Sequence, residues 1–490
     1  MEKSEKSENG NELHVVFLPF LTPSHMIPLV DAARLFASYS GIKATIITTP
    51  ANAALFKAAT DHDIKLGHKI CVLTLNFPSI EVGLPEGIEN FSAATSLEML
   101  GKVAKGLSLL QQPMENLILE IRPNCIFSDM FYPWTNDVAA QLKIPRLLFY
   151  PTNFISHVVP YNLELYEPYK KVNSDSESFL IPGLPDKIEM KSSQLEDHVK
   201  TKTTFGEILK VIKESELHCY GVVHDTIYEL EPQYVEYHKK VKGQKYWTIG
   251  PLFHFSNREK ANDDTNHRHD CFDWLDTQEP DSVILICFGS IVRFTAAQLK
   301  QIALALEAAN QPFIWVVRNT EKGEEQGEGE RWLPDGFEER LKKENRGLII
   351  RSWAPQLKIL RHKAIGGFIT HCGWNSLLEA ITCGVPVITW PLFAEQFYNE
   401  KLIEIQEIGV RVGADVWHFT PVIESVVGSE QISEAIKRLM ESSDESKKIR
   451  ENAHKVSAIA KKAVVEGGSS HENLVSLIKE LKSCSFGMNN

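Results

Sequence analysis

The sequence lacks a hydrophobic run long enough to cross a membrane. Among its 490 residues, no stretch approaches the roughly 18 consecutive apolar residues that a membrane-spanning helix needs. The first residues, MEKSEKSENGNELH, are polar and charged with no apolar stretch behind them, which is not the pattern of a secretory signal. We therefore expect a cytoplasmic protein without a membrane span.

Cysteine pairs and excess positive charge are also missing. The eight cysteines are scattered and include no C-x-x-C pair, which argues against a disulfide framework and a zinc site, so we expect no metal. Acidic residues outnumber basic ones, 64 to 52, for a formal net charge of −12. Such a chain has no general attraction to nucleic acid or an anionic membrane. Any phosphate group that it binds must be held by local donors.

Short apolar runs alternate with helical patterns along the chain. In the first half, strands are predicted at residues 14–20, 43–48, 125–128 and 146–150, and a helix at 26–37. In the second half, strands are predicted at 283–287, 313–317, 348–351, 365–370 and 385–389, and helices at 295–308, 374–382 and beyond 429. This alternation is typical of parallel sheets with helices on both faces.

A chain of this length is expected to form two domains. We predict an α/β protein with two doubly wound, Rossmann-like domains that face each other across a cleft. The predicted parts are a first domain at 1–252, a polar linker at 253–270, a second domain at 271–460, and a C-terminal helix at 461–490 that packs back on the first domain. A Gly/Glu run at 321–330 is predicted to be a loop. In such sheets, ligands bind at the carboxyl ends of the strands.

Residues 353–396 form the most informative segment, WAPQLKILRHKAIGGFITHCGWNSLLEAITCGVPVITWPLFAEQ. A strand at 365–370 is followed by a tight turn and a helix that opens at Trp374. The first amides of a helix lack internal partners and lie at the positive end of its dipole, which makes an anion site suited to a pyrophosphate. An ordinary strand-turn-helix unit with a glycine turn and core tryptophans would give the same pattern.

The same segment resembles the signature box of plant family-one UDP-dependent glycosyltransferases. The resemblance covers its full length, including the W-A-P-Q opening, the H-C-G-W-N-S core and the E-Q ending. It implies a GT-B fold, a UDP-sugar co-substrate and no further cofactor. The segments FLPFLTPSHMIPLVDAARLFA and GLP at 183–185 look like the branch that acts on triterpenoid or steroid sapogenins and on flavonoids.

The resemblance implies a donor-binding role for the residues of this box. The uracil and ribose are expected to meet Trp353, the backbone of Ala354, Gln356 and Glu379. The diphosphate is expected to meet His371, Asn375 and Ser376. The sugar hydroxyls are expected to meet Trp374, Glu395 and Gln396.

Three positions, two at the end of the box and one before it, refine the donor prediction. In the family the box usually ends in Gln for glucose donors, whereas His is associated with galactose, so Gln396 favours UDP-glucose. Many members have Asp where this chain has Glu395, and the carboxylate is kept. Phe288-Gly289-Ser290 follows the predicted strand at 283–287 and resembles the family's F-G-S loop, which implies that Ser290 contacts the diphosphate.

Sugar transfer to a hydroxyl needs a base, and histidine is suited because its pKa lies near the working pH. A carboxylate on the far ring nitrogen would fix the tautomer and stabilise the imidazolium. His25 and Asp129 both follow predicted strands and match the family's catalytic dyad. The family usually has Gly before this histidine, whereas this chain has Ser24. His371 is a competing base, but its place at a helix start suits phosphate better.

The acceptor site is predicted in three apolar segments of the first half, at 82–92, 151–159 and 190–198. Candidate contacts are Thr152, Phe154 and Phe393. The favoured function is that of a monomeric, inverting transferase that moves glucose from UDP-glucose to a hydroxyl of a small lipophilic acceptor by direct displacement.

Three other functions are weighed against this one. C-glycosylation of a phenol would use the same dyad. A nucleotide-sugar binding protein without turnover would not need His25 and Asp129. A dinucleotide-dependent oxidoreductase would need a G-x-G-x-x-G after its first strand, which this chain lacks.

Overall fold

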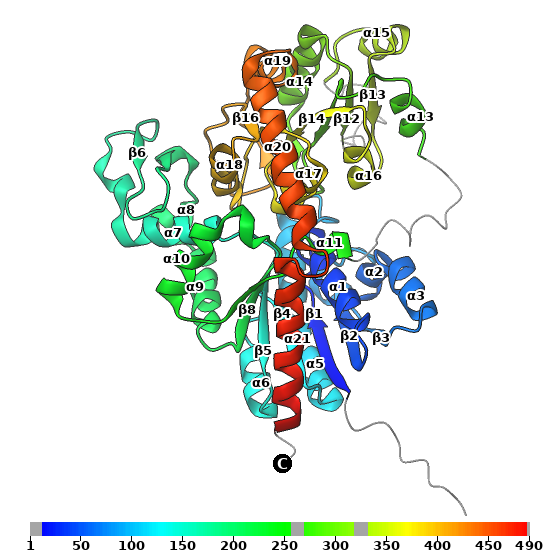
Figure 1. The fold of residues 1–490 in the computed structure, drawn as a ribbon, viewed down its shortest axis with the longest axis vertical. Coiled ribbons are helices and arrows are strands. Elements are labelled where there is room, and N and C mark those ends of the chain that lie inside the picture. The colour runs from blue at the N-terminus through cyan, green and yellow to red at the C-terminus, as the bar shows by residue number, and fades with distance from the viewer. Residues whose placement is uncertain (1–11, 256–268, 318–331, 488–490) are drawn as a thin grey trace, which may run out of the picture.

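The computed structural model describes residues 12–255, 269–317 and 332–487 (Figure 1). The predicted Gly/Glu loop and most of the predicted linker lie outside the described residues. The described residues form two parallel sheets with helices on their faces, which confirms the predicted α/β class and the two Rossmann-like units. The domain boundaries at 252, 270 and 460 stay a prediction.

The first sheet has seven parallel strands in the order β3-β2-β1-β4-β5-β8-β9. Their bounds are Leu13–Leu18 (β1), Ile42–Thr48 (β2), Ile70–Thr74 (β3), Cys125–Asp129 (β4), Arg146–Tyr150 (β5), Gly221–His224 (β8) and Tyr246–Thr248 (β9). The strands are apolar runs because helices cover both faces. The order reverses between β1 and β4, where Leu18 pairs with Ser128, so the topological switch lies at the ends of these two strands.

The second sheet has six parallel strands in the order β13-β12-β10-β14-β15-β16. Their bounds are Val283–Cys287 (β10), Phe313–Val316 (β12), Gly347–Ile350 (β13), Ile365–Thr370 (β14), Val387–Thr389 (β15) and Gly409–Arg411 (β16). Here the order reverses between β10 and β14, where Cys287 pairs with Thr370. Two short ladders, β6 (Ser178–Leu180) with β7 (Glu189–Lys191) and β11 (Arg293–Phe294) with β17 (Val422–Ile423), lie outside the main sheets.

The helices of the first half are α1 (Pro23–Ala37), α2 (Pro50–Ala54), α3 (Lys57–Lys65), α4 (Ser79–Val82), α5 (Leu97–Ile121), α6 (Thr135–Leu142), α7 (Ile155–Tyr166), α8 (Asp197–Lys200), α9 (Thr204–Glu216), α10 (Pro232–Lys242) and α11 (Leu252–Phe255). Three short 3₁₀ turns are Pro168–Lys171, Ser192–Gln194 and Tyr228–Leu230. Helix α1 begins three residues before its predicted start, because Pro23 is preset for the first helical position.

The helices of the second half are α13 (Cys271–Leu275), α14 (Ala296–Ala309), α15 (Phe337–Glu344), α16 (Gln356–Leu360), α17 (Trp374–Cys383), α18 (Gln396–Ile405), α19 (Ser429–Met440), α20 (Asp444–Ala463) and α21 (Ser469–Gly487). The hydroxyl of Thr295 accepts a hydrogen bond from the Gln298 amide and caps α14. Within the described residues, no helix is both long and apolar enough to cross the membrane.

The last helix returns to the first sheet (Figure 1). Its side chains Leu474, Leu477 and Leu481 are fully buried in the same apolar cluster as Leu13 of β1. The Asn473 side-chain amide also donates to the backbone carbonyl of Thr248 in β9, at 3.1 Å. The chain therefore crosses from the second half back to the first before it ends.

Candidate functional site

His25 and Asp129 meet at the switch of the first sheet. His25 lies in the first turn of α1 rather than in a loop, and Asp129 is the last residue of β4. The Nδ1 atom of His25 lies 2.8 Å from Oδ2 of Asp129. The Asp129 side chain is fully buried, whereas the His25 side chain is 18% exposed. The imidazole is thus reachable while its partner is shielded from water.

The surroundings of the pair polarise the imidazole. Burial alone would lower the pKa of His25, but the charge and hydrogen bond of Asp129, together with the charge of Glu395, raise it above its ordinary value. The second carboxylate oxygen, Oδ1 of Asp129, accepts a hydrogen bond from the Phe131 amide at 3.0 Å. Both oxygens are therefore engaged, and Nε2 is the ring nitrogen left to meet a substrate.

His371 lies directly after β14, three residues before the start of α17, and two glycines lie close to its ring. A Cβ on Gly289, which has φ +75°, would lie 2.8 Å from the His371 ring, and a Cβ on Gly373 would lie 2.5 Å from it. Only glycine leaves room for the ring at both positions. Burial lowers the pKa of His371 to about 4, so this imidazole is neutral at pH 7 and its ring can donate one hydrogen bond.

A second group of donor-box residues gathers around Gln356. Its amide nitrogen donates to Oε2 of Glu379 at 2.8 Å and to Oγ of Ser376 at 3.2 Å. Trp353 nearby in the chain is 71% exposed. A large aromatic ring left open to solvent is the kind of surface on which a base stacks.

Glu395 and Gln396 stand at the start of α18. The side-chain oxygen of Gln396 accepts hydrogen bonds from the amides of Leu392 and Phe393, at 2.9 and 3.1 Å, which fixes the loop and leaves the amide NH₂ as a donor. Burial raises the pKa of Glu395, against the opposing influence of His25. Glu395 and His25 each influence the pKa of the other, so the end of the signature box lies near the catalytic pair.

Sequence reasoning missed Asn399, one helical turn after Glu395. Its amide nitrogen donates to Oε1 of Glu395 at 3.3 Å and to the carbonyl of Cys372 at 2.9 Å. Its oxygen accepts from the amide of Asn153 in the first half, at 2.7 Å. No helix was predicted over residues 396–405, where the spacing of four residues places Asn399 beside Glu395. The link to Asn153 is visible only in the fold.

Two more contacts join the halves at the donor box. The side-chain amide of Asn375 donates to the carbonyl of Ser24, next to His25, at 2.8 Å. The indole nitrogen of Trp374 donates to the carbonyl of Asp225 at 2.7 Å, and this side chain is only 2% exposed. The one polar side-chain atom of Trp374 is therefore already bonded, and the contact of this residue with the sugar stays a prediction.

The remaining predicted residues occupy different environments. Oγ1 of Thr152 lies 2.8 Å from Nε2 of His157, and Ser290 is half-buried after β10. The ring of Phe393 lies 6.4 Å from that of His371. Phe154 is fully buried and stacks on His224, with ring centroids 4.1 Å apart. The structure thus corrects the prediction for Phe154, whose ring belongs to the core and offers no surface to an acceptor.

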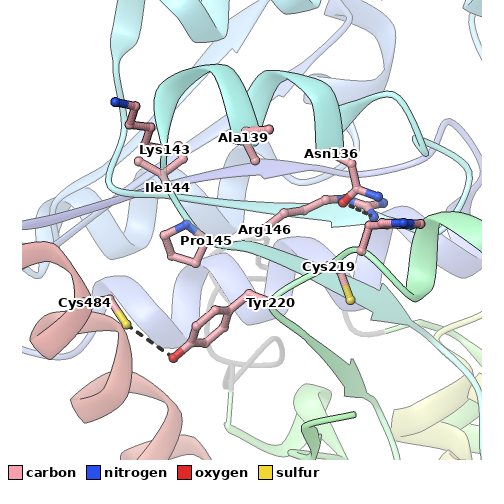
Figure 2. Close-up of a pocket in the computed structure, with 11 residues that line it drawn as sticks. Asn136, Ala139, Lys143, Ile144, Pro145, Arg146, Cys219, Tyr220 and Cys484 are labelled. Atoms are coloured by element: carbon pink, nitrogen blue, oxygen red, sulfur yellow. Dashed lines mark hydrogen bonds between the residues drawn. The ribbon is translucent and has the colours of Figure 1, made fainter. Parts of the chain in front are cut away.

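The described residues hold no metal-ligating cluster, and a cavity lies away from the predicted site residues. Within residues 12–255, 269–317 and 332–487, no group of three or more metal-ligating side chains is arranged to hold an ion. A cavity of about 340 Å³ lies elsewhere in the first half, near the amino end of β5 (Figure 2). None of the predicted site residues lines it.

The whole chain is similar in sequence and fold to known proteins. The family model described as "UDP-glucoronosyl and UDP-glucosyl transferase" matches residues 248–467. Nuatigenin 3-beta-glucosyltransferase of Solanum aculeatissimum is 52% identical over 97% of this chain and 98% of its own, and solanidine UDP-glucose glucosyltransferase 1 of Solanum tuberosum is 50% identical over the same shares. The crystal structure of a Glycyrrhiza uralensis protein complexed with glycyrrhetinic acid 3-O-monoglucuronide has a TM-score of 0.91 at 41% identity, over 98% of this chain and 97% of its own.

Proposed function

Because the chain belongs to the plant family of UDP-dependent glycosyltransferases, we propose that it transfers glucose from UDP-glucose to a hydroxyl of a steroid sapogenin. The fold is of the GT-B type, as in the solved relatives, and the chain is an enzyme of the UDP-glycosyltransferase class. The names of the two Solanum relatives refer to a steroidal acceptor and a steroidal alkaloid, and both name glucosyl transfer.

The observation that carries the mechanism is the hydrogen bond between His25 Nδ1 and Asp129 Oδ2, with a distance of 2.8 Å. With Nδ1–H donated to Asp129, Nε2 has a free lone pair and takes the proton of the acceptor hydroxyl. The acceptor oxygen forms a bond to the anomeric carbon from the face opposite to UDP. The bond between that carbon and the β-phosphate oxygen breaks, its electron pair leaves with UDP, and the configuration inverts.

The donor is held by groups that match its parts in chemistry. Trp353 offers an open ring to the uracil, and Glu379, oriented by Gln356, accepts from the ribose hydroxyls. The diphosphate meets the first amides of α17, the neutral imidazole of His371, and the hydroxyls of Ser376 and Ser290. Because these donors also face the charge that develops on the departing UDP, they stabilise the transition state as well as the ground state.

The sugar lies between the dyad and the start of α18. Glu395 and the free NH₂ of Gln396 offer an acceptor and a donor to its hydroxyls, and Asn399 orients Glu395. The terminal Gln396 supports glucose as the sugar. Transfer to carbon is the second candidate, since His25 would equally deprotonate a phenol, but the names of the two Solanum relatives favour a hydroxyl of a sapogenin.

The test is an acceptor panel read by mass spectrometry. The purified chain is incubated with UDP-glucose, UDP-galactose or UDP-glucuronate and with steroidal sapogenins, triterpenoid sapogenins and flavonols. We expect one added hexose on a steroidal sapogenin, with UDP-glucose as the preferred donor, and release of that sugar by acid, which cleaves an O-glycoside and spares a C-glycoside. If the chain binds UDP-glucose yet modifies only non-steroidal acceptors, the acceptor assignment is wrong.

A variant isolates the role of the base. His25→Ala is expected to bind UDP-glucose as the wild type does and to form no product, because it keeps the donor box and loses the group that takes the proton. Substantial turnover by this variant would show that another residue is the base.

A further inference from the structure

The proposed sugar end of the donor box is the loop between β15 and α18. Gln396 closes this loop from the helix side, because its side-chain oxygen accepts from the amides of Leu392 and Phe393, at 2.9 and 3.1 Å. Ala394 has φ +50°, a left-handed conformation that residues other than glycine rarely adopt. Such a backbone persists only where its surroundings hold it. Glu395 comes next in the chain, so whatever holds Ala394 also sets the place of the Glu395 carboxylate.

A segment that follows β16 holds this loop from the other side. The indole nitrogen of Trp417 donates to the carbonyl of Ala394 at 3.1 Å, and the amide of His418 donates to the carbonyl of Leu392 at 2.8 Å. The His418 ring is itself held, since its Nε2 lies 2.8 Å from Oγ of Ser425. Two carbonyls of the loop are thus bonded to neighbouring residues of one segment.

The same segment is attached to the first half of the chain. The amide of Trp417 donates to the carbonyl of Ser193 at 2.8 Å. Asp415 accepts from Nζ of Lys191 at 2.6 Å and from the side-chain amide of Gln194 at 3.0 Å. All three first-half partners belong to a segment from which the sequence predicts acceptor contacts. Trp417 therefore bonds the sugar loop with its side chain and the acceptor half with its backbone.

Packing alone does not require a tryptophan at this position. Trp417 is half-buried and packs against the core cluster that contains Phe397 of α18, and α18 is itself a neighbour of α7 in the first half (Figure 1). A purely apolar ring would fill the same space. The indole adds one hydrogen-bond donor, and this donor ends on the carbonyl that directly precedes Glu395.

The contacts of this indole concern the sugar and leave the rest of the donor alone. The groups proposed for the uracil, the ribose and the diphosphate are Trp353, Glu379 and His371, which lie in earlier parts of the box. Glu395 and Gln396 are the groups proposed for the sugar hydroxyls. A displacement of the loop therefore changes how the sugar is met, while the contacts proposed for UDP stay in place.

We propose that Trp417 is a positioning residue that sets the sugar specificity of the donor site. It acts through the Ala394 carbonyl on Glu395 and Gln396, and it does not touch the sugar itself. This inference rests on the proposed transfer of glucose, and it adds the residue that keeps the sugar loop in register with the acceptor half. Glucose and galactose differ only in the direction of the C4 hydroxyl, so polar groups must be held in one place to distinguish them.

The experiment compares the wild type with Trp417→Phe, which keeps an aromatic ring and loses the N–H. Initial rates with a steroidal sapogenin give kcat/KM for UDP-glucose and for UDP-galactose, and product inhibition gives Ki for UDP. We expect kcat/KM for UDP-glucose to fall roughly tenfold, as when a carbonyl loses its donor. The value for UDP-galactose should change by less than about threefold, because galactose makes fewer of the contacts that the loop provides, and Ki for UDP should stay within about twofold.

Gln406→Leu serves as the matched control. Gln406 directly follows α18, and its side-chain amide donates to the carbonyl of Leu230 in the first half at 2.8 Å. The control thus removes a bond of the same kind between the halves, at the opposite end of the helix that begins at Gln396. We expect the ratio of kcat/KM for the two donors to keep its wild-type value. An equal loss of glucose preference in Gln406→Leu would show that attachment of the halves sets the preference, and it would overturn the proposal.

The outcomes of Trp417→Phe are equally decisive. An unchanged donor preference in the folded variant overturns the proposal, and so does a Ki for UDP that rises as much as KM for UDP-glucose, since either result marks a purely structural role. If the variant does not fold, Asp415→Asn takes its place, because it keeps the indole and loses the ion pair with Lys191 that anchors the segment. The proposal then requires a reduced glucose preference with unchanged UDP affinity, and a preserved preference overturns it.

The wild type in the same assay reports separately on the proposed function. A wild type that prefers UDP-galactose refutes the glucose assignment, and Trp417→Phe must then reduce that preference instead. If the wild type turns over neither donor, the dissociation constants of UDP, UDP-glucose and UDP-galactose are measured by calorimetry. The proposal then requires the variant to lose discrimination between the two sugars while its affinity for UDP holds.

Discussion

Replacing Asp129 by Asn tests the dyad most directly, because the two side chains have the same shape. In the structure both carboxylate oxygens accept: Oδ1 from the Phe131 amide at 3.0 Å and Oδ2 from Nδ1 of His25 at 2.8 Å. An Asn side chain has one acceptor and one donor. If its oxygen keeps the Phe131 bond, its NH₂ faces His25, and the imidazole must then carry its proton on Nε2.

A histidine with its proton on Nε2 cannot take a proton there. We expect kcat to fall by about 10³–10⁴-fold, the loss that the same tautomer reversal causes in hydrolase triads, which corresponds to about 4–5 kcal/mol of barrier. The donor box is untouched, so the affinity for UDP should stay within about twofold.

The assay measures initial rates of product formation with saturating UDP-glucose, alongside UDP binding by calorimetry and thermal unfolding of the free enzyme. Asp129→Glu serves as a companion variant that keeps the charge and displaces it by one methylene. A value of kcat for Asp129→Asn within tenfold of the wild type would refute the tautomer argument. An equal loss of UDP affinity would show that the substitution damages the donor half instead.

Three further predictions rest on separate parts of the structure. Trp353→Ala should weaken UDP binding by roughly 10-fold, as expected for loss of base stacking, and leave the melting temperature unchanged because the ring is 71% exposed; unaltered binding would contradict the stacking role. Gly373→Ala places a Cβ 2.5 Å from the His371 ring, so the KM for UDP-glucose should rise at least tenfold while the acceptor KM holds, and an unchanged donor KM would show that the ring is free to shift. Burial lowers the pKa of His224 from 6.5 to about 3, so between these pH values the unfolded chain binds a proton on this residue and the folded chain does not. The free energy of unfolding should therefore fall as pH falls below 6.5, by up to about 1.4 kcal/mol per pH unit. His224→Phe should flatten this slope in denaturant titrations.

The sheets could be predicted from the sequence because strands covered on both faces are apolar throughout. The predicted run at 14–20 ends at Leu18 since Pro19 follows it, and the run at 385–389 starts only after Pro386, which has no amide to donate. The start of α17 was also predictable, because the turn before it and the apolar periodicity after it are both local.

The directions of individual side chains could not be predicted, because they depend on partners far away in the chain. Trp374 was expected at the sugar, but the carbonyl of Asp225 takes its indole N–H. Phe154 was expected to face the acceptor and instead packs on His224. Arg146 begins a short apolar strand, and its burial follows from the fold of residues 128–136 around it.

The return of α21 to the first sheet bears on how such enzymes can be recombined. The final leucines of the chain, Leu474, Leu477 and Leu481, belong to the core of the first half. Dividing the sequence at the linker therefore does not give two parts that each contain a complete core. A chimera that takes its acceptor half from one relative and its donor half from another should also take residues 469–487 from the parent of the acceptor half. To exchange the donor specificity alone, a chimera must therefore replace an internal segment of the chain. Such a replacement has two junctions, one at the linker and one before α21.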